Sequence, residues 1–124
     1  MKIAVSASGW HPAAAVVPQF GRCAGFVVYD TDDRAYSTVM TASRRRVGAG
    51  LRVAHALVNN GVEVVITGNI GPHAFNVLRT AGVRCYLTMN GTVKDCLAAY
   101  ETGQLKEINA ATVPQYAGVV KAGR

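Results

Sequence analysis

Residues 62–75 join a β-branched run to a glycine turn and then to a helical pattern, with no spacer between them. The run predicts a buried strand, and Pro72 stands at the first helical position, where its missing backbone N–H costs nothing. Gly68 and Gly71 allow the main chain to turn tightly and to come close to a ligand. Because the first N–H groups of a helix lack partners and its positive dipole end faces the loop, this turn favours an anion.

The spacing of the two glycines is not specific by itself. A Walker loop needs a following Lys-Ser/Thr, and a dinucleotide fingerprint needs a third glycine, and the sequence has neither. A tight turn in an α/β fold is therefore as good an interpretation as an anion site.

The remaining pattern predicts an α/β domain with a five-stranded mixed sheet and three helices. Polar residues 31–34 indicate an antiparallel hairpin, and two helical crossovers make the later strands parallel to the first. The Gly68 loop is then expected at the carboxyl edge of the sheet, where such folds bind ligands. We expect strands at residues 2–8, 25–30, 35–40, 62–67 and 83–87, and helices at residues 51–60, at residues 72–81 and after Thr92, with Asp95 completing a capping box.

The length and composition suit one domain. The chain has 124 residues, half of them hydrophobic, so we expect a domain at residues 1–108 followed by a flexible basic tail at residues 109–124. No apolar run approaches the ~20 residues of a membrane helix, and no secretory signal is recognisable, so a cytoplasmic protein is expected. Cys23, Cys85 and Cys96 form no C-x-x-C pair, which argues against a disulfide framework and a structural zinc site.

Basic residues dominate the middle of the chain. The formal net charge is +6, and residues 34–94 contain one acid, Glu63, among many cations. The densest cluster is the run Arg44, Arg45 and Arg46. Such a run is usually a solvated loop, and a contact with a nucleic-acid backbone is the alternative. No aromatic residues interleave with these arginines as base stacking requires, so a small, multiply charged anion fits better.

Catalytic interpretations depend on few residues. The acids at positions 30, 32 and 33 lie in the hairpin turn and are interpreted as turn formers rather than as a metal cluster. Cys23 follows Arg22, which would lower the pKa of a neighbouring thiol, and His11 lies in the same loop, so a Cys/His nucleophile is an alternative to a buried cysteine. His73 could meet a soft metal or a sulfide, although no H-x-x-H spacing supports a metal site built from protein ligands.

Six segments in order carry a family resemblance: MKIAVS at 1–6, FGRC at 20–23, FVVYD at 26–30, GAG at 48–50, VITGNIGP at 65–72 and GTV at 91–93. Together they resemble the nitrogenase iron-molybdenum cofactor biosynthesis family, the NifX-like accessory proteins, over roughly residues 1–108. Within that family the chain resembles the small stand-alone members called orange proteins. It departs from the family pattern at Pro18, which lacks the usual flanking acid and arginine, and at His73, where asparagine is usual.

The resemblance implies a ribonuclease H-like fold and a non-catalytic carrier of a preformed metal–sulfur cluster. In orange proteins the cluster is an anionic molybdenum-copper-sulfide species, and an iron-molybdenum cofactor precursor or an iron-sulfide species is the alternative cargo. Such a cluster brings its own sulfides. It therefore needs positive charge, backbone N–H groups and an apolar cover more than it needs thiolates.

The candidate site residues are of three kinds. Charge would come from the arginine run, a backbone cradle from residues 68–72, and secondary contacts from two histidines and an arginine. A protein that delivers or receives the cluster is an expected partner, whereas nucleic acid and membranes are not. A nucleic-acid-binding module and a small enzyme that uses Cys23 remain the alternatives. The expected cluster contacts are His11, Arg22, Arg44, Arg45, Arg46, Gly48, Gly50, Gly68, Asn69, Ile70, Gly71, Pro72 and His73, with His73 and Cys23 as candidate metal ligands.

Overall fold

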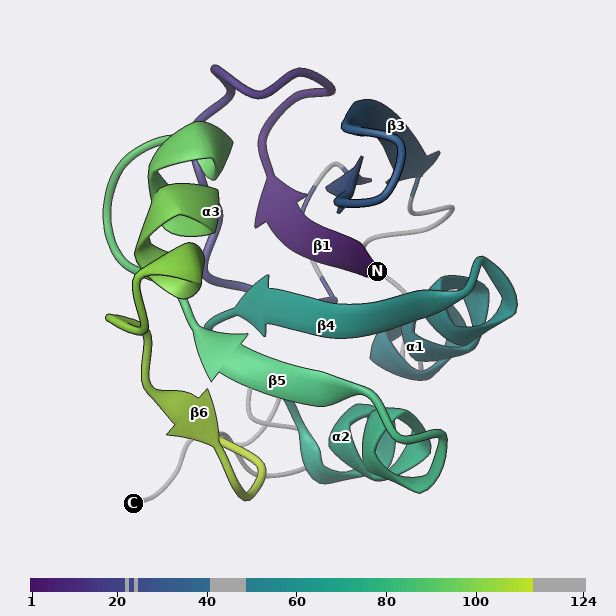
Figure 1. Cartoon of the computed structure of the whole chain (residues 1–124). Helices are drawn as coiled ribbons and strands as arrows, with labels where there is room; N and C mark the ends of the chain where they lie inside the picture. Colours follow the sequence, from purple (N-terminus) through teal and green to yellow (C-terminus); the bar gives the residue numbers. More distant parts are fainter. Residues whose placement is uncertain (22, 24, 41–48, 113–124) are drawn as a thin grey trace.

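The computed structural model describes residues 1–21, 23, 25–40 and 49–112, which build one mixed β-sheet flanked by helices on both faces (Figure 1). The strands are β1 (Lys2–Ala7), β2 (Gly25–Asp30), β3 (Ala35–Met40), β4 (Val62–Thr67), β5 (Arg84–Leu87) and β6 (Glu107–Ile108). The helices are α1 (Ala49–Asn59), α2 (Pro72–Thr80) and α3 (Val93–Glu101).

The strand order across the sheet is β3-β2-β1-β4-β5-β6. β4 is parallel to β1 and β5 is parallel to β4, whereas β2, β3 and β6 are antiparallel to their neighbours. The two central strands, β1 and β4, are almost entirely buried, as expected for strands covered on both faces. The antiparallel hairpin and the parallel crossovers predicted from the sequence are therefore confirmed.

The described part of the chain has six strands, where the sequence predicted five. The additional strand, β6, contains only Glu107 and Ile108, which pair with Tyr86 and Cys85 of β5. Two residues are too few to show an alternating pattern, and the strand forms because β5 offers an edge to pair with. The prediction of five strands was wrong for this reason.

The core has two layers, one on each face of the sheet. Alternation along β1 points Ala4 toward α1 and α2, and points Ile3 and Val5 toward α3. Figure 1 shows α1 and α2 side by side on one face, with α3 on the other. The helix residues buried in these layers are Val53, Ala54 and Leu57 of α1, Ala74, Phe75 and Leu78 of α2, and Val93, Cys96 and Leu97 of α3.

The predicted capping box at the start of α3 is confirmed. The Thr92 hydroxyl accepts a hydrogen bond from the Asp95 N–H at 3.2 Å, and the Asp95 carboxylate accepts one from the Thr92 N–H at 2.9 Å. The bond from the Thr92 backbone lowers the pKa of the Asp95 carboxyl, because it stabilises the charged form.

The chain continues beyond β6 for four described residues, 109–112. Ala111 among them packs against the core on the α1 and α2 face. Residues 113–124 lie outside the described residues, so the expected domain boundary at 108 and the flexible tail stay predictions.

Candidate functional site

Three parallel strands end at one side of the sheet, which we call the carboxyl edge. β1 ends at Ala7, β4 at Thr67 and β5 at Leu87, and their arrowheads point the same way in Figure 1. Antiparallel pairing brings Gly25 at the start of β2 beside Ala7, and Met40 at the end of β3 beside Gly25. The loops after β1, β4 and β5 therefore meet at the edge where folds of this class bind ligands.

The Gly68 loop is held from both sides. The Asn69 N–H donates to the Pro18 carbonyl at 2.8 Å, and the Ile70 N–H donates to the Thr112 hydroxyl at 2.9 Å. Ile70 is buried, while the Asn69 side chain is exposed. The sequence predicted a backbone cradle over residues 68–72. The N–H groups of Asn69 and Ile70 are not available to it, because partners distant in the sequence use both.

Donors remain at the first turn of α2. Gly71 caps this helix without a side-chain hydrogen bond, and Pro72 occupies its first position. The first helical hydrogen bond runs from the Phe75 N–H to the Gly71 carbonyl. The N–H groups of His73 and Ala74 precede that bond, and the His73 side chain is exposed. The anion-favouring part of the predicted cradle is thus the helix start rather than the loop before it.

Three segments that are far apart in the sequence converge beside this turn. The position that a Cβ on Gly21 would occupy lies 3.3 Å from the Gly50 backbone, and that of a Cβ on Gly50 lies 3.7 Å from Ala74 Cβ and 3.9 Å from the Phe20 ring. The first turns of α1 and α2 therefore meet the end of the loop that follows β1. Arg52, in the first turn of α1, is exposed and was not among the expected site residues.

Five candidate residues lie outside the described residues: Arg22, Arg44, Arg45, Arg46 and Gly48. Their described neighbours belong to the carboxyl edge. Gly21 precedes Arg22 and packs against Gly50, and the segment 41–48 runs between Met40 and α1, which both lie at this edge. The contacts proposed for these five residues stay predictions.

Acidic side chains are segregated from this part of the edge. Five of the seven acids lie at the opposite edge. Asp30 ends β2, Asp32 and Asp33 occupy the turn before β3, Glu63 lies near the start of β4, and Glu101 ends α3. Glu107 forms an ion pair of 3.2 Å with Arg84 at the start of β5, and Asp95 is engaged in the capping box on the α3 side. On the α1 and α2 side of the carboxyl edge, the described chain places no carboxylate.

His11 belongs to a different part of the edge. Its loop lies against α3, because the Val93 and Lys94 N–H groups donate to the carbonyls of Ala14 and Pro12 at 3.0 Å. His73 stands on α2, on the other face of the sheet. The structure therefore places His11 and the first turn of α2 on opposite faces of the sheet, which argues against a shared contact, and the contact itself stays a prediction.

The α3 side of the edge also exposes Trp10 and Met40, which no sequence pattern distinguished. The position of a Cβ on Gly25 lies 3.1 Å from Trp10 Nε1 and 3.5 Å from Met40 Cα, so both residues lie close to Gly25. Gly25 shares a face with Val27, which packs under α3. These two apolar side chains are therefore grouped with His11 rather than with His73.

Cys23 is part of the core rather than of the surface. Its side chain is buried with Phe20 and Phe26, and its Sγ donates to the Phe20 carbonyl at 3.6 Å. A thiol in this position cannot reach a ligand at the edge without rearrangement of the core. This burial argues against Cys23 as a metal ligand and as the nucleophile of an enzyme, and both stay untested predictions.

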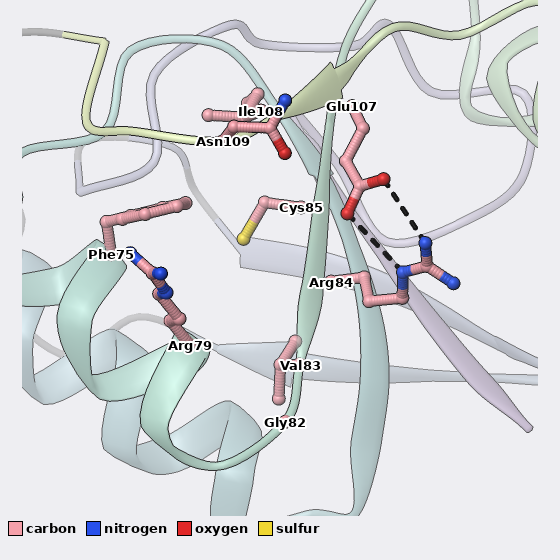
Figure 2. A pocket seen from close by; sticks show the side chains of 9 residues that line it. All are labelled: Phe75, Arg79, Gly82, Val83, Arg84, Cys85, Glu107, Ile108 and Asn109. Carbon is pink, nitrogen blue, oxygen red and sulfur yellow. Dashed lines mark hydrogen bonds and ion pairs between the residues drawn. The ribbon is translucent and has the colours of Figure 1, made fainter.

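A hollow of about 300 Å³ lies away from the carboxyl edge, between α2 and strands β5 and β6 (Figure 2). Figure 2 shows the Cys85 sulfur pointing to the side where Phe75 lies, whereas the Arg84 and Glu107 side chains lie on the other side of β5. Burial raises the pKa of the Cys85 thiol to about 12, so the thiol stays protonated at neutral pH. It does not offer the thiolate that metals bind, and we place no metal here.

Among the described residues, no group of three or more His, Cys, Asp and Glu residues is arranged to hold a metal ion. None of the helices within the described ranges has the length and hydropathy needed to cross a membrane.

Residues 1–103 match the model of a protein family described as dinitrogenase iron-molybdenum cofactor. The structure of the apo form of the orange protein from Desulfovibrio gigas is similar, with a TM-score of 0.84, 35% identity, and coverage of 90% of this chain and 95% of the other. A NifB-like protein from Thermotoga gives a TM-score of 0.81 at 32% identity, with coverage of 90% and 96%. An uncharacterized protein of Methanocaldococcus jannaschii is 28% identical over 94 residues, which cover 73% of this chain and 80% of that protein.

These relatives confirm the ribonuclease H-like fold that the resemblance implied. The family model covers most of the chain, and two solved structures exceed 30% identity over nine-tenths of it. The chain therefore belongs to the dinitrogenase iron-molybdenum cofactor family.

Proposed function

We propose that this protein is a non-catalytic carrier that binds an anionic metal–sulfur cluster, without covalent bonds, on the α1 and α2 side of its carboxyl edge. A molybdenum-copper-sulfide cluster is the favoured cargo, because the orange protein is a close structural relative. An iron-molybdenum cofactor precursor or an iron-sulfide species is the alternative, supported by the family to which the chain belongs. The proposed partner is a protein that delivers the cluster to this carrier or receives it.

The observation that carries the proposal is the convergence at Gly50. The loop end at Gly21 and the first turn of α2 at Ala74 both contact it, in a part of the edge where the described residues include no carboxylate. An anion of several charges is stabilised by helix N-termini and by cations, and carboxylates nearby would oppose it.

The described residues suit a cluster that already has its sulfides. The N–H groups of His73 and Ala74 can donate to sulfide, and the His73 side chain is exposed on the same turn. Arg52, in the first turn of α1, is an exposed cation that we propose as a further contact. The buried ring of Phe20 lies 3.9 Å from the position of a Cβ on Gly50, so the core behind this convergence is apolar. Arg44, Arg45 and Arg46 are proposed to supply most of the neutralising charge.

The proposal is tested by loading the protein without oxygen. One sample receives tetrathiomolybdate and copper, and a second receives iron and sulfide. Each is desalted, and its metals, sulfide and visible spectrum are measured. We expect stoichiometric molybdenum and copper with sulfide-to-metal charge-transfer bands. Retention of iron instead would identify the alternative cargo.

The control separates local from overall charge. In one variant Arg44, Arg45 and Arg46 are replaced by Gln. In the control, Lys2, Arg34 and Arg79 are replaced by Gln, which removes the same charge from the opposite edge. We expect loss of the cluster only in the first variant, and equal retention in both would reject the charge mechanism. If the wild-type protein retains neither set of metals, the carrier proposal is rejected, and a mobility shift with short oligonucleotides at low salt tests the nucleic-acid alternative.

A further inference from the structure

Thr112 connects the end of the described chain to the Gly68 loop. Its hydroxyl accepts a hydrogen bond from the Ile70 N–H at 2.9 Å and donates one to the Gly68 carbonyl at 2.9 Å. Its own N–H donates to the Ile70 carbonyl at 3.0 Å. One threonine thus satisfies three polar groups of a loop from which it is separated by more than 40 positions.

Residues 109–112, which we call the strap, follow β6 and return to the end of β4. Ile108 pairs with Cys85 on β5, and four residues later Thr112 reaches the Gly68 loop. Ala111 packs on the same core layer as Ile70 and Phe75. The strap is therefore anchored by both side-chain packing and hydrogen bonds.

The opposite side of the loop is closed by Pro18. The Asn69 N–H donates to the Pro18 carbonyl, and a Cβ on Gly68 would lie only 2.5 Å from that same oxygen. The loop is therefore fixed between Pro18 and Thr112, with Ile70 buried beneath it. Pro72 follows two residues after Ile70, so the place of the loop determines the place of the first turn of α2.

We infer that Thr112 is a positioning residue, through which the strap orders the Gly68 loop and the first turn of α2 for the cluster. This inference rests on the proposed function. When the donors of a site are already fixed, binding of the anion costs little conformational entropy. If the loop becomes mobile, binding must order it, and the cluster should dissociate faster.

The test compares three substitutions. Thr112→Val keeps the shape of the side chain but removes its hydroxyl, Thr112→Ser keeps the hydroxyl, and Thr102→Val removes a hydroxyl that bonds to carbonyls at the far end of α3. Two quantities are measured for each variant: the dissociation rate of the cluster formed with tetrathiomolybdate and copper, and the hydrogen-exchange rates of the Ile70 and Phe75 amides, whose N–H groups are bonded to Thr112 and to the Gly71 carbonyl.

We expect Thr112→Val to raise the cluster dissociation rate and the Ile70 exchange rate about tenfold each, the equivalent of one lost hydrogen bond. Thr112→Ser should stay near wild type, and Thr102→Val should leave both rates unchanged. Equal dissociation rates for wild type and Thr112→Val would overturn the inference. If the wild-type protein retains no cluster, the proposed function fails, whereas unchanged exchange at Ile70 and Phe75 in Thr112→Val would separately overturn the ordering of the loop by Thr112.

Discussion

The hydroxyl of Ser6 lies 3.0 Å from the hydroxyl of Thr67, so that a buried polar pair joins the carboxyl ends of the two central strands, β1 and β4. The Ser6 hydroxyl also bonds to the Val17 carbonyl. Serine has a single hydroxyl proton. With that proton given to Val17, Ser6 accepts its second bond from Thr67, and the order of donors runs from Thr67 to Ser6 to Val17.

This order predicts unequal costs for two substitutions. Ser6→Ala leaves both the Thr67 hydroxyl and the Val17 carbonyl without this partner and should lower the free energy of unfolding by about 2–3 kcal/mol. Thr67→Val removes only the terminal donor and should cost about 1 kcal/mol. Urea unfolding of both variants measures the difference. A larger loss for Thr67→Val would mean that the donor order is reversed.

Gly68 and Gly71 should respond differently to the same substitution. A Cβ at Gly68 would lie 2.5 Å from the Pro18 carbonyl oxygen, and backbone atoms cannot move aside cheaply, so Gly68→Ala should cost about 3 kcal/mol. A Cβ at Gly71 meets nothing within 4 Å, so Gly71→Ala should cost at most about 1 kcal/mol through the helix cap. Thermal and urea unfolding check this pair. Equal losses would contradict the close approach of Pro18.

The capping box gives a stability difference that depends on pH. The pKa of Asp95 is lowered in the folded protein from its ordinary value of 3.8, so its contribution is fully present above that value and disappears as the pH falls through the folded pKa. Asp95→Ala should therefore be less stable than wild type at pH 7, and the two should converge as the pH falls below 3.8. Glu101→Ala, at the other end of the same helix, should cause no such loss. Urea midpoints across the pH range provide the measurement.

The cysteines should be unreactive in the native protein. Cys23, Cys85 and Cys96 are all buried, and burial raises the pKa of the Cys85 and Cys96 thiols. Because the thiolate is the nucleophile, we expect slow reaction with a disulfide reagent at pH 7 and rapid reaction of all three in denaturant. Fast, selective reaction of native Cys23 would revive the enzyme hypothesis.

The sequence predicted the local parts of this fold better than the distant ones. The strand, turn and helix of residues 62–80 follow from β-branched residues, glycines and Pro72, all of which act within a few positions. The acceptors of the Asn69 and Ile70 N–H groups could not be predicted, because Pro18 and Thr112 come close to them only after the chain has folded.

The same limit applies to the candidate site. The sequence could place Gly68 at the carboxyl edge from strand order alone, and the structure agrees. It grouped His11 with His73, since nothing in either local pattern says which face of the sheet each loop follows. The contact between Gly21 and Gly50 could not be predicted from the sequence either, because glycines contribute nothing to a hydrophobic periodicity.

The placement of the acids makes the two edges of the sheet differ in their carboxylates. An anion that diffuses toward the β2–β3 turn meets three aspartates, two of which are paired with the N-terminal ammonium, whereas one that approaches the α1 and α2 side of the carboxyl edge meets no carboxylate of the described residues. We expect this difference to favour the capture of anionic cargo on the α1 and α2 side. Added salt should slow its capture more than its release, because screening acts on the approach.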